Sequence, residues 1–300
     1  MEQRFRSFII ILLVLILPNM FLAQDQSETT SKFPVLKGPY LGQKPPGMNP
    51  EVFAPGIIST NSHEGCSGFT EDGSIFIFRR SGYGILIMEK KNGVWSPPYQ
   101  AQFAFKGQDG DFMVAPDGKK IFIASGRPLT KGAQPTRNHN IWVVERTSAG
   151  WSKPRPLEHP INTNWHESYP SVTRDGTLYF FKRFKDPEGK ADIYRSKLVE
   201  GKYTKVKKLS VMINTKYNDL DGFIALDESY LIFCSDRPGG YGNSDFYVSF
   251  RKNGDSWTEP VNMGEKINSS AAEWIPYVTP DEKYFFFTSN KSGNREIYGS

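Results

Sequence analysis

Cysteine is scarce in this chain of 300 residues, which contains only Cys66 and Cys234. Two cysteines cannot build a disulfide scaffold, and the sequence has no C-x-x-C motif, so structural zinc sites and thioredoxin-like chemistry are excluded. We interpret both cysteines as small buried hydrophobic residues. Their scarcity also suits an exported protein.

Runs of like charge are missing as well. The 37 basic and 32 acidic side chains leave a net charge of +5, and no five consecutive residues share one sign. A nucleic-acid binder usually concentrates its basic residues, so we expect no nucleic-acid partner. The common hydrolase motifs G-x-S-x-G and H-E-x-x-H are also absent from the sequence.

Long apolar runs are absent except near the N-terminus. Arg4 and Arg6 precede an apolar run over residues 8–17, and the small residue Ala23 follows it. This order is typical of a signal peptide, which we predict over residues 1–23. The run is short for a helix that must cross about 30 Å of hydrocarbon. We therefore expect no stable membrane span after cleavage, a periplasmic or secreted protein, and a flexible lead-in over residues 24–50.

A turn of one kind recurs five times in the rest of the chain. Its aspartates stand 45 to 58 residues apart and are Asp72, Asp117, Asp175, Asp227 and Asp281. Each turn introduces a short strand of β-formers, such as Ser74 to Phe78, and a further strand and a Gly-x-aromatic segment follow in most units. Four strands in about 50 residues, without a long helical period, are typical of a β-propeller blade.

The count of strands predicts how the ring closes. The chain ends soon after the third strand of the fifth unit, so the fourth strand of that unit is missing from the C-terminal end. The segment from Pro55 to Glu64 parallels Val261 to Ser270, which predicts that an N-terminal strand completes the last blade. We therefore predict an all-β propeller of five four-stranded blades over residues 51–300, and regard six blades as the weaker alternative. Closure removes the unpaired edges on which chains aggregate.

The turns, and above all the loop from Ser235 to Asp245, resemble the TolB-type, WD40-like propeller repeat of bacterial envelope proteins over about 240 residues. The resemblance implies a propeller of the periplasm or cell surface that usually binds a partner rather than catalysing a reaction. We expect it to be a monomer. Such proteins often carry an OmpA-like peptidoglycan domain, which these 300 residues do not show. The implied function is a binding or scaffolding module whose partner is an envelope protein or a glycan.

An acidic residue stands eight positions before every turn aspartate. These five acids are Glu64, Asp109, Glu167, Asp219 and Glu273. The first strand of a propeller blade is the innermost, so we predict that the five carboxylates surround one mouth of the central channel. Their neighbours include His63, His166, Trp165, Trp274, Asp111 and Asp221. Basic residues follow the turns at eight to ten positions, namely Arg80, Arg127, Arg183, Arg237 and Lys291.

Three interpretations of this ring stay open. A position that recurs in every blade is typical of blade construction, which favours a structural belt of salt bridges. Crowded carboxylates also attract cations, so the ring could hold a ligand or a calcium ion, the one cofactor that we consider. As the enzymatic alternative, two or three of the acids could act as a glycoside hydrolase.

A further hypothesis places the binding face on the outer loops. The long loop from Gly126 to Asn140 is the largest insertion in any unit, and such insertions often bind partners. We interpret His139, within this loop, as an exposed polar residue.

Overall fold

The computed structural model describes residues 33–184 and 189–300. The predicted signal peptide and the first part of the predicted lead-in fall outside these residues. Within the described part, strands dominate and the one helix is a short 3-10 turn, Tyr40–Gly42. No helix there has the length and hydropathy that crossing a bilayer requires.

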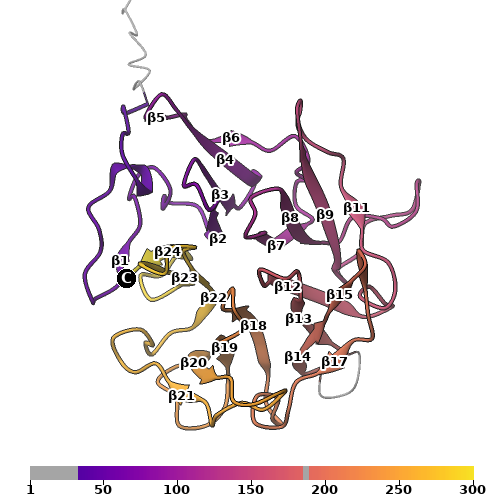
Figure 1. Cartoon of the computed structure of the whole chain (residues 1–300). Helices are drawn as coiled ribbons and strands as arrows, with labels where there is room; N and C mark the ends of the chain where they lie inside the picture. Colours follow the sequence, from indigo (N-terminus) through magenta and orange to yellow (C-terminus); the bar gives the residue numbers. More distant parts are fainter. Residues whose placement is uncertain (1–32, 185–188) are drawn as a thin grey trace, which may run out of the picture. The chain divides into compact units, whose positions relative to one another are not determined.

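Five antiparallel sheets form a ring of blades, as Figure 1 shows. Blade 1 contains β2 (Glu64–Phe69), β3 (Ile75–Arg80), β4 (Gly84–Lys91), β5 (Val94–Trp95) and β6 (Tyr99–Gln100). Blade 2 contains β7 (Asp109–Val114), β8 (Lys120–Ser125), β9 (Asn140–Thr147), β10 (Gly150–Trp151) and β11 (Arg155–Pro156). In both blades the first strand lies innermost and the later strands follow outward.

The other three blades repeat this order. Blade 3 contains β12 (His166–Val172), β13 (Leu178–Arg183), β14 (Ala191–Ser196) and β17 (Lys207–Lys208), beside a small hairpin of β15 (Leu198–Val199) and β16 (Lys202–Tyr203). Blade 4 contains β18 (Asp219–Ile224), β19 (Tyr230–Ser235), β20 (Asp245–Phe250) and β21 (Val261–Asn262). Blade 5 contains β22 (Glu273–Val278), β23 (Phe285–Ser289), β24 (Glu296–Gly299) and β1 (Glu51–Val52). The predicted five-bladed propeller is thereby confirmed.

The ring closes through a strand from the N-terminal side, as predicted. Strand β1 pairs antiparallel with β24, and Val52 lies opposite Tyr298. The pairing strand lies just ahead of the segment from Pro55 to Glu64 whose repeat pattern predicted it. Figure 1 shows β1 beside the end of the chain. Every blade thus has a partner for its third strand.

The recurring turns form because their aspartates accept local hydrogen bonds. In the first turn, Asp72 Oδ1 accepts bonds from Thr70 Oγ1 at 2.6 Å and from the Ser74 amide at 3.0 Å. Gly73 adopts a φ of +59°, which glycine tolerates without steric cost. Glu228 and Glu282 occupy the same position in the last two turns with φ values of +64° and +56°. The hydrogen bonds of these turns hold the strained conformation there.

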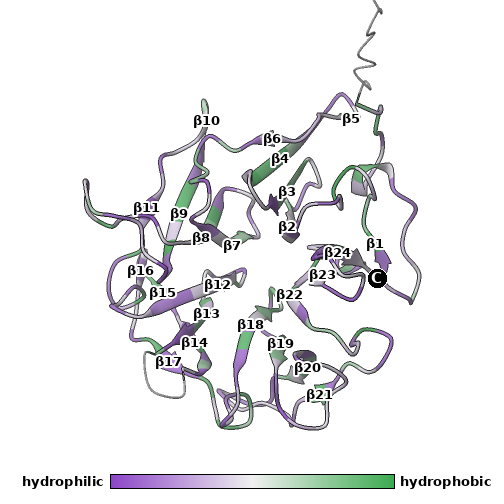
Figure 2. Ribbon diagram, turned by 180° about the vertical axis from the view of Figure 1, so that it is seen from behind, coloured by the Kyte–Doolittle hydropathy of each residue, from purple (hydrophilic) through white to green (hydrophobic). Residues whose placement is uncertain are grey.

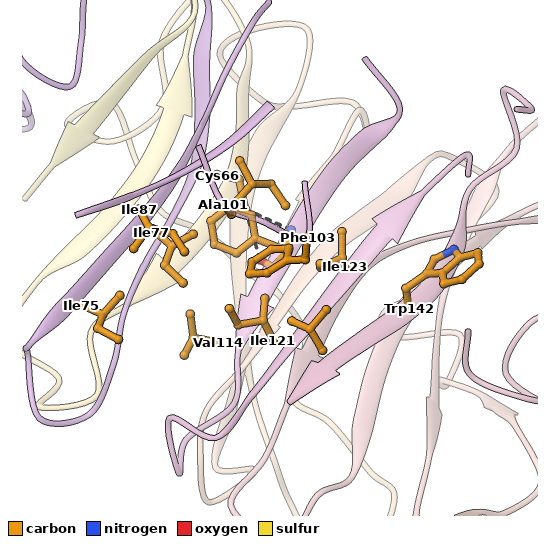
Figure 3. Packing of buried hydrophobic residues seen from close by; sticks show 13 residues of the cluster. Cys66, Ile75, Ile77, Ile87, Ala101, Phe103, Val114, Ile121, Ile123 and Trp142 are labelled. Atoms are coloured by element: carbon orange, nitrogen blue, oxygen red, sulfur yellow. Dashed lines mark hydrogen bonds between the residues drawn. The ribbon is translucent and has the colours of Figure 1, made fainter. Parts of the chain in front are cut away.

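The hydrophobic core lies between neighbouring blades. Figure 3 shows Ile77 and Ile87 of blade 1 packed near Ile121 and Ile123 of blade 2, with Trp142 further out. Figure 2 shows hydrophobic stretches along blade strands such as β4 and β9, whereas much of the connecting chain is hydrophilic. Cys66 and Cys234 are buried free thiols, as predicted.

Candidate functional site

The five predicted acids occupy equivalent places at the start of the innermost strands. They are buried, with exposed fractions of 0 to 3%. Each carboxylate accepts a hydrogen bond from the backbone amide four residues before it, and in four blades that residue is a serine or threonine whose hydroxyl donates as well. The donor residues are Thr60, Phe105, Thr163, Thr215 and Ser269. The acid therefore holds the turn that leads into its blade.

Four of the acids also form an ion pair with the second strand of their own blade or with the loop after it. Arg80 Nε lies 2.8 Å from Glu64 Oε1, and Arg237 Nη2 lies 2.6 Å from Asp219 Oδ1. Arg127 pairs with Asp109 in the same way. The fifth acid, Glu273, accepts a bond from Ser289 Oγ at 3.0 Å instead. Within the described residues no lysine or arginine nitrogen lies within 4.0 Å of Glu273.

In blade 3 the cation is Lys182, whereas the sequence spacing predicted Arg183. Lys182 Nζ lies 3.3 Å from Glu167 Oε1, and the Lys182 side chain is 8% exposed. The strand register explains the correction: Lys182 lies opposite Glu167 and Arg183 lies opposite His166. Residues that face each other across an antiparallel pair point to the same side, so Lys182 shares the side of Glu167.

The linkers between the blades are tied at a second point. Five residues before three of the acids, a buried or half-buried asparagine bonds the third strand of the preceding blade. Asn214 Oδ1 accepts a bond from the Ile193 amide at 2.7 Å, and its Nδ2 donates to the Ile193 carbonyl at 2.9 Å. Asn162 and Asn268 make the same pair of bonds. We call the five acids with their donors and cations the carboxylate belt. Such contacts are what the interpretation of the acids as a structural belt of salt bridges requires.

No group of three or more His, Cys, Asp or Glu side chains within residues 33–184 and 189–300 is arranged to hold a metal ion. The belt carboxylates already accept bonds from internal donors. A ligand role for the belt stays a prediction.

The innermost strands carry a second repeated feature two residues beyond each acid. The strand pairing is irregular there in all five blades. In four blades a residue other than glycine adopts a positive φ at this point, namely Cys66, Tyr169, Asp221 and Ile275, with values of +48° to +60°. Such bulges re-aim side chains and are common next to functional sites.

The side chains at the bulges meet across the centre of the ring. Cys66 Sγ accepts a bond from the Phe112 amide at 3.2 Å, which joins blades 1 and 2. The Tyr169 hydroxyl donates to the Pro276 carbonyl oxygen and so joins blades 3 and 5, which are not neighbours. Asp221 Oδ2 accepts a bond from the Ile275 amide at 3.3 Å. The bulges therefore bring residues of all five blades together at the channel.

A pocket of about 430 Å³ opens beside these bulges. We call it the channel pocket. Its lining is His63, Glu64, Gly65, Arg79, Ser81, Asp111, Asp221, Trp274, Ile275, Thr288 and Arg295. Of the predicted site residues, only His63, Glu64 and Trp274 belong to this lining. The other four belt acids and Arg127, Arg183 and Arg237 are not part of it.

The channel pocket mixes charges of both signs. Arg79 Nε donates to the Asp109 carbonyl oxygen at 3.0 Å, which fixes its guanidinium. The guanidinium of Arg295 lies over the Trp274 ring at 4.7 Å from the centroid. Asp111 Oδ2 accepts a bond from Ser168 Oγ at 3.1 Å.

Burial raises the pKa of the Asp111 carboxyl, and the positive charge of Arg79 opposes this rise most strongly. Burial also raises the pKa of Asp221 well above its ordinary range, and the charge of Asp111 adds to that rise. Because burial raises both pKa values and the charge of Asp111 raises that of Asp221 further, Asp221 favours its protonated form. Arg295 acts on both aspartates in the opposite sense.

Two histidines stack beside Asp111. The ring centroids of His139 and His166 are 4.8 Å apart, and the His139 amide donates to His166 Nδ1 at 3.0 Å. Burial, followed by the neighbouring His139 and then by the charge of Arg183, lowers the pKa of His166 to about 4. The prediction that His139 is an exposed loop residue was wrong, because the end of its loop folds back onto β12. Trp165 is 37% exposed and packs edge-on against Phe184.

Sequence reasoning noted Asp111 and Asp221 only as neighbours of the belt, and it missed Arg79, Thr288 and Arg295. Arg79 could have been found, because side chains alternate along a strand and its neighbour Arg80 pairs with a belt acid. Thr288 takes in blade 5 the place that Arg79 takes in blade 1, and Arg295 takes the place of His139, just before the third strand, but the other blades carry different residue types there. They become pocket residues only through the arrangement of blade 5.

Comparisons with known proteins support the fold. No family model matches this chain, and no curated protein matches it either. Among solved structures, a candidate TolB from Agrobacterium tumefaciens is 17% identical, with a TM-score of 0.50 over 77% of this chain and 71% of that one. A GH43 endo-arabinanase from Bacillus licheniformis is 10% identical, with a TM-score of 0.50 over 78% of this chain and 92% of that one. Likeness at such identities shows the fold alone. The chain is a five-bladed β-propeller.

Proposed function

We propose that this chain is an exported binding module of the bacterial cell envelope, whose channel pocket engages a protein or glycan ligand. One observation carries the proposal. The belt acids are satisfied by several internal donors in every blade, whereas Arg79, Asp111, Asp221 and Arg295 gather charged groups of both signs in one pocket. Binding sites collect a few convergent polar groups in a concave surface in this way.

The envelope location rests on the N-terminal sequence and on the likeness to a TolB-type propeller. Export is tested by expressing the full chain in a bacterial host and fractionating the cells. We expect the protein in the periplasm or medium, with its first residue after Ala23. A chain that keeps residues 1–23 and stays in the cytoplasm would contradict the export part of the proposal.

Ligand binding is tested with labelled full-length protein on arrays of glycans and of short peptides. We expect signals for one of the two classes that fall at least tenfold in Arg295→Gln, whose side chain is exposed and carries no belt contact. The matched control is Arg174→Gln, another exposed arginine, which lies in the turn after β12. Signals that survive Arg295→Gln and Asp221→Asn together would place binding elsewhere.

A glycan-active enzyme is the second candidate, and the presence of Asp111 and Asp221 in one pocket favours it. Glycoside hydrolysis uses two carboxyl groups of different protonation state, and burial, which raises the pKa of Asp111 and of Asp221, favours a carboxyl group that keeps its proton. If the protein is such an enzyme, incubating it with a panel of oligosaccharides that includes arabino-oligosaccharides should release new reducing ends. Loss of that product in Asp221→Asn, with binding retained, would favour the enzyme over the binding module.

A further inference from the structure

Two arginines supply the positive charge of the channel pocket. Arg79 and Arg295 line it, and Arg183 acts on Asp221 and on His166 from the neighbouring strand β13. The two lining arginines balance the two lining aspartates when both aspartates are ionised, and the pocket gains one positive charge when the aspartates keep a proton. Arg183 adds positive potential from outside the lining. Glu64 adds nothing to this balance because its charge is matched by Arg80 at 2.8 Å. The pocket is therefore suited to a ligand with a single negative charge, and guanidinium groups bind carboxylates well.

The wall of the pocket also contains a buried hydroxyl without a partner in the described part of the chain. Thr288 lines it, is 2% exposed, and its Oγ1 has no hydrogen-bond partner among the described residues. Gly65 lies directly beside this group, and a Cβ placed on Gly65 would come within 3.3 Å of Thr288 Oγ1. A buried hydroxyl without a partner destabilises the protein, so a ligand that satisfies it gains affinity. Its position in the wall makes it an independent sign that the pocket holds a polar ligand.

The remaining lining suits hydroxyl groups. A pair of aspartates that keeps a proton presents both a hydrogen-bond donor and acceptors, and a sugar hydroxyl can accept from the donor or donate to an acceptor. Trp274 supplies an aromatic surface at the same place. The volume of about 430 Å³ lies toward the small end of ligand pockets, which matches one sugar ring better than a longer peptide segment. A phosphate dianion fits less well, because it would approach two aspartates.

We propose that the channel pocket binds an acidic sugar, with its carboxylate held by Arg79 and Arg295 and its hydroxyls by Asp111, Asp221 and Thr288. This inference rests on the proposed binding function and names the ligand class of that site. It requires that recognition depends on the carboxylate of the sugar. It also requires that the hydroxyl of Thr288 contributes to binding and not to folding.

The first test is isothermal titration calorimetry with the full chain at low salt. The probes are D-galacturonate and D-glucuronate, the matching neutral sugars D-galactose and D-glucose, inorganic phosphate, and a short peptide with a free C-terminal carboxylate. We expect one of the two uronates to bind at least tenfold more tightly than its neutral sugar, and more tightly than phosphate or the peptide.

Variants assign the binding to the pocket. Arg295→Gln should reduce the preference for the acid over the neutral sugar from tenfold to near unity, whereas the exposed control Arg174→Gln should keep it. Thr288→Val removes the hydroxyl at constant shape, and it should weaken uronate binding several-fold without lowering the melting temperature. The melting temperature of each variant shows directly whether it has folded.

The contrary outcomes separate this inference from the proposed function. Equal affinity for acidic and neutral sugars, lost in Thr288→Val, would overturn the acid preference and leave the binding module standing. If phosphate or the peptide binds more tightly than either uronate, the assignment of the ligand as a sugar is overturned. Binding of none of the probes, together with no pocket-dependent signal on the arrays, would overturn both.

Discussion

Strands β7 and β18 each carry two aspartates that lie only two residues apart and have opposite surroundings. On β18, Asp219 accepts bonds from the Thr215 amide at 2.6 Å and from Ser235 Oγ at 2.7 Å, and it pairs with Arg237. Asp221 accepts only a long bond from the Ile275 amide and a contact from the Cys234 thiol. The first belongs to the carboxylate belt and the second to the channel pocket. The donors around a carboxylate, and not its residue type, decide whether it stabilises the fold.

The contrast between the belt acids and the pocket acids also distinguishes residues that stabilise the fold from candidate functional residues. The belt repeats around the ring with its donors in place, as expected for a feature that each blade needs. The pocket acids occur in two blades only, Asp221 buried and Asp111 half-buried, and they have few donors, which costs folding free energy. Proteins retain such costs mainly at functional sites, and this is why the pocket and not the belt is our candidate site.

The largest expected effect comes from removing a belt acid. Asp219→Ala would leave Arg237, whose side chain is 15% exposed, without its partner, and would free the donors of Thr215 and Ser235. We expect a loss of about 3–5 kcal/mol in the free energy of unfolding, measured with urea. Asp117→Ala, in an exposed turn, is the control and should cost about 1 kcal/mol. Equal losses for the two variants would remove the belt as a stabilising feature.

An intermediate effect is expected for two neighbouring cations of blade 3. Lys182→Gln should cost about 2–3 kcal/mol, because buried Glu167 loses its charged partner but keeps the bonds from Thr163. Arg183→Gln, one residue later and exposed, should change stability by less than about 0.5 kcal/mol. Both are measured by thermal and urea unfolding. A larger loss of stability in Arg183→Gln than in Lys182→Gln would mean that Arg183 belongs to the belt, and it would contradict the strand register.

The smallest effect has the opposite sign. Burial raises the pKa of Asp221, so the folded state holds its proton more tightly than the unfolded chain does. Its stabilising contribution is complete below the unfolded pKa of about 4, and it is lost as the pH rises through the folded pKa. Asp221→Asn removes this loss and should raise stability at pH 7 by about 1 kcal/mol, or a few degrees in melting temperature.

The pH profile provides the check on this last variant. The advantage of Asp221→Asn should be small near pH 4 and grow toward neutral pH, when melting temperatures are recorded across that range. A variant less stable than the parent protein at every pH would mean that the carboxylate of Asp221 stabilises the fold as a belt acid does.

Much of the fold could be predicted from the sequence, because its signals are local. The turn aspartates and the β-formers after them lie within a few residues of each other, so their spacing alone predicts the blades. The regular spacing of the belt acids was also visible. The spacing predicted the cation correctly where the predicted residue lies on the same side of the sheet as the acid, as Arg80 and Arg237 do. It was wrong by one residue in blade 3, where Lys182 and not Arg183 pairs with the acid.

The sequence by itself determined the number of blades, the closure by an N-terminal strand and the places of the five belt acids, since hydrogen bonds within a blade and strand periodicity are short-range effects. Only the tertiary structure decided which acids are satisfied and which face the channel. The bulges could not be predicted from glycines in the sequence, because the residues with positive φ there are Cys66, Tyr169, Asp221 and Ile275. The channel pocket is assembled from residues of four blades, and their proximity follows from closing the ring.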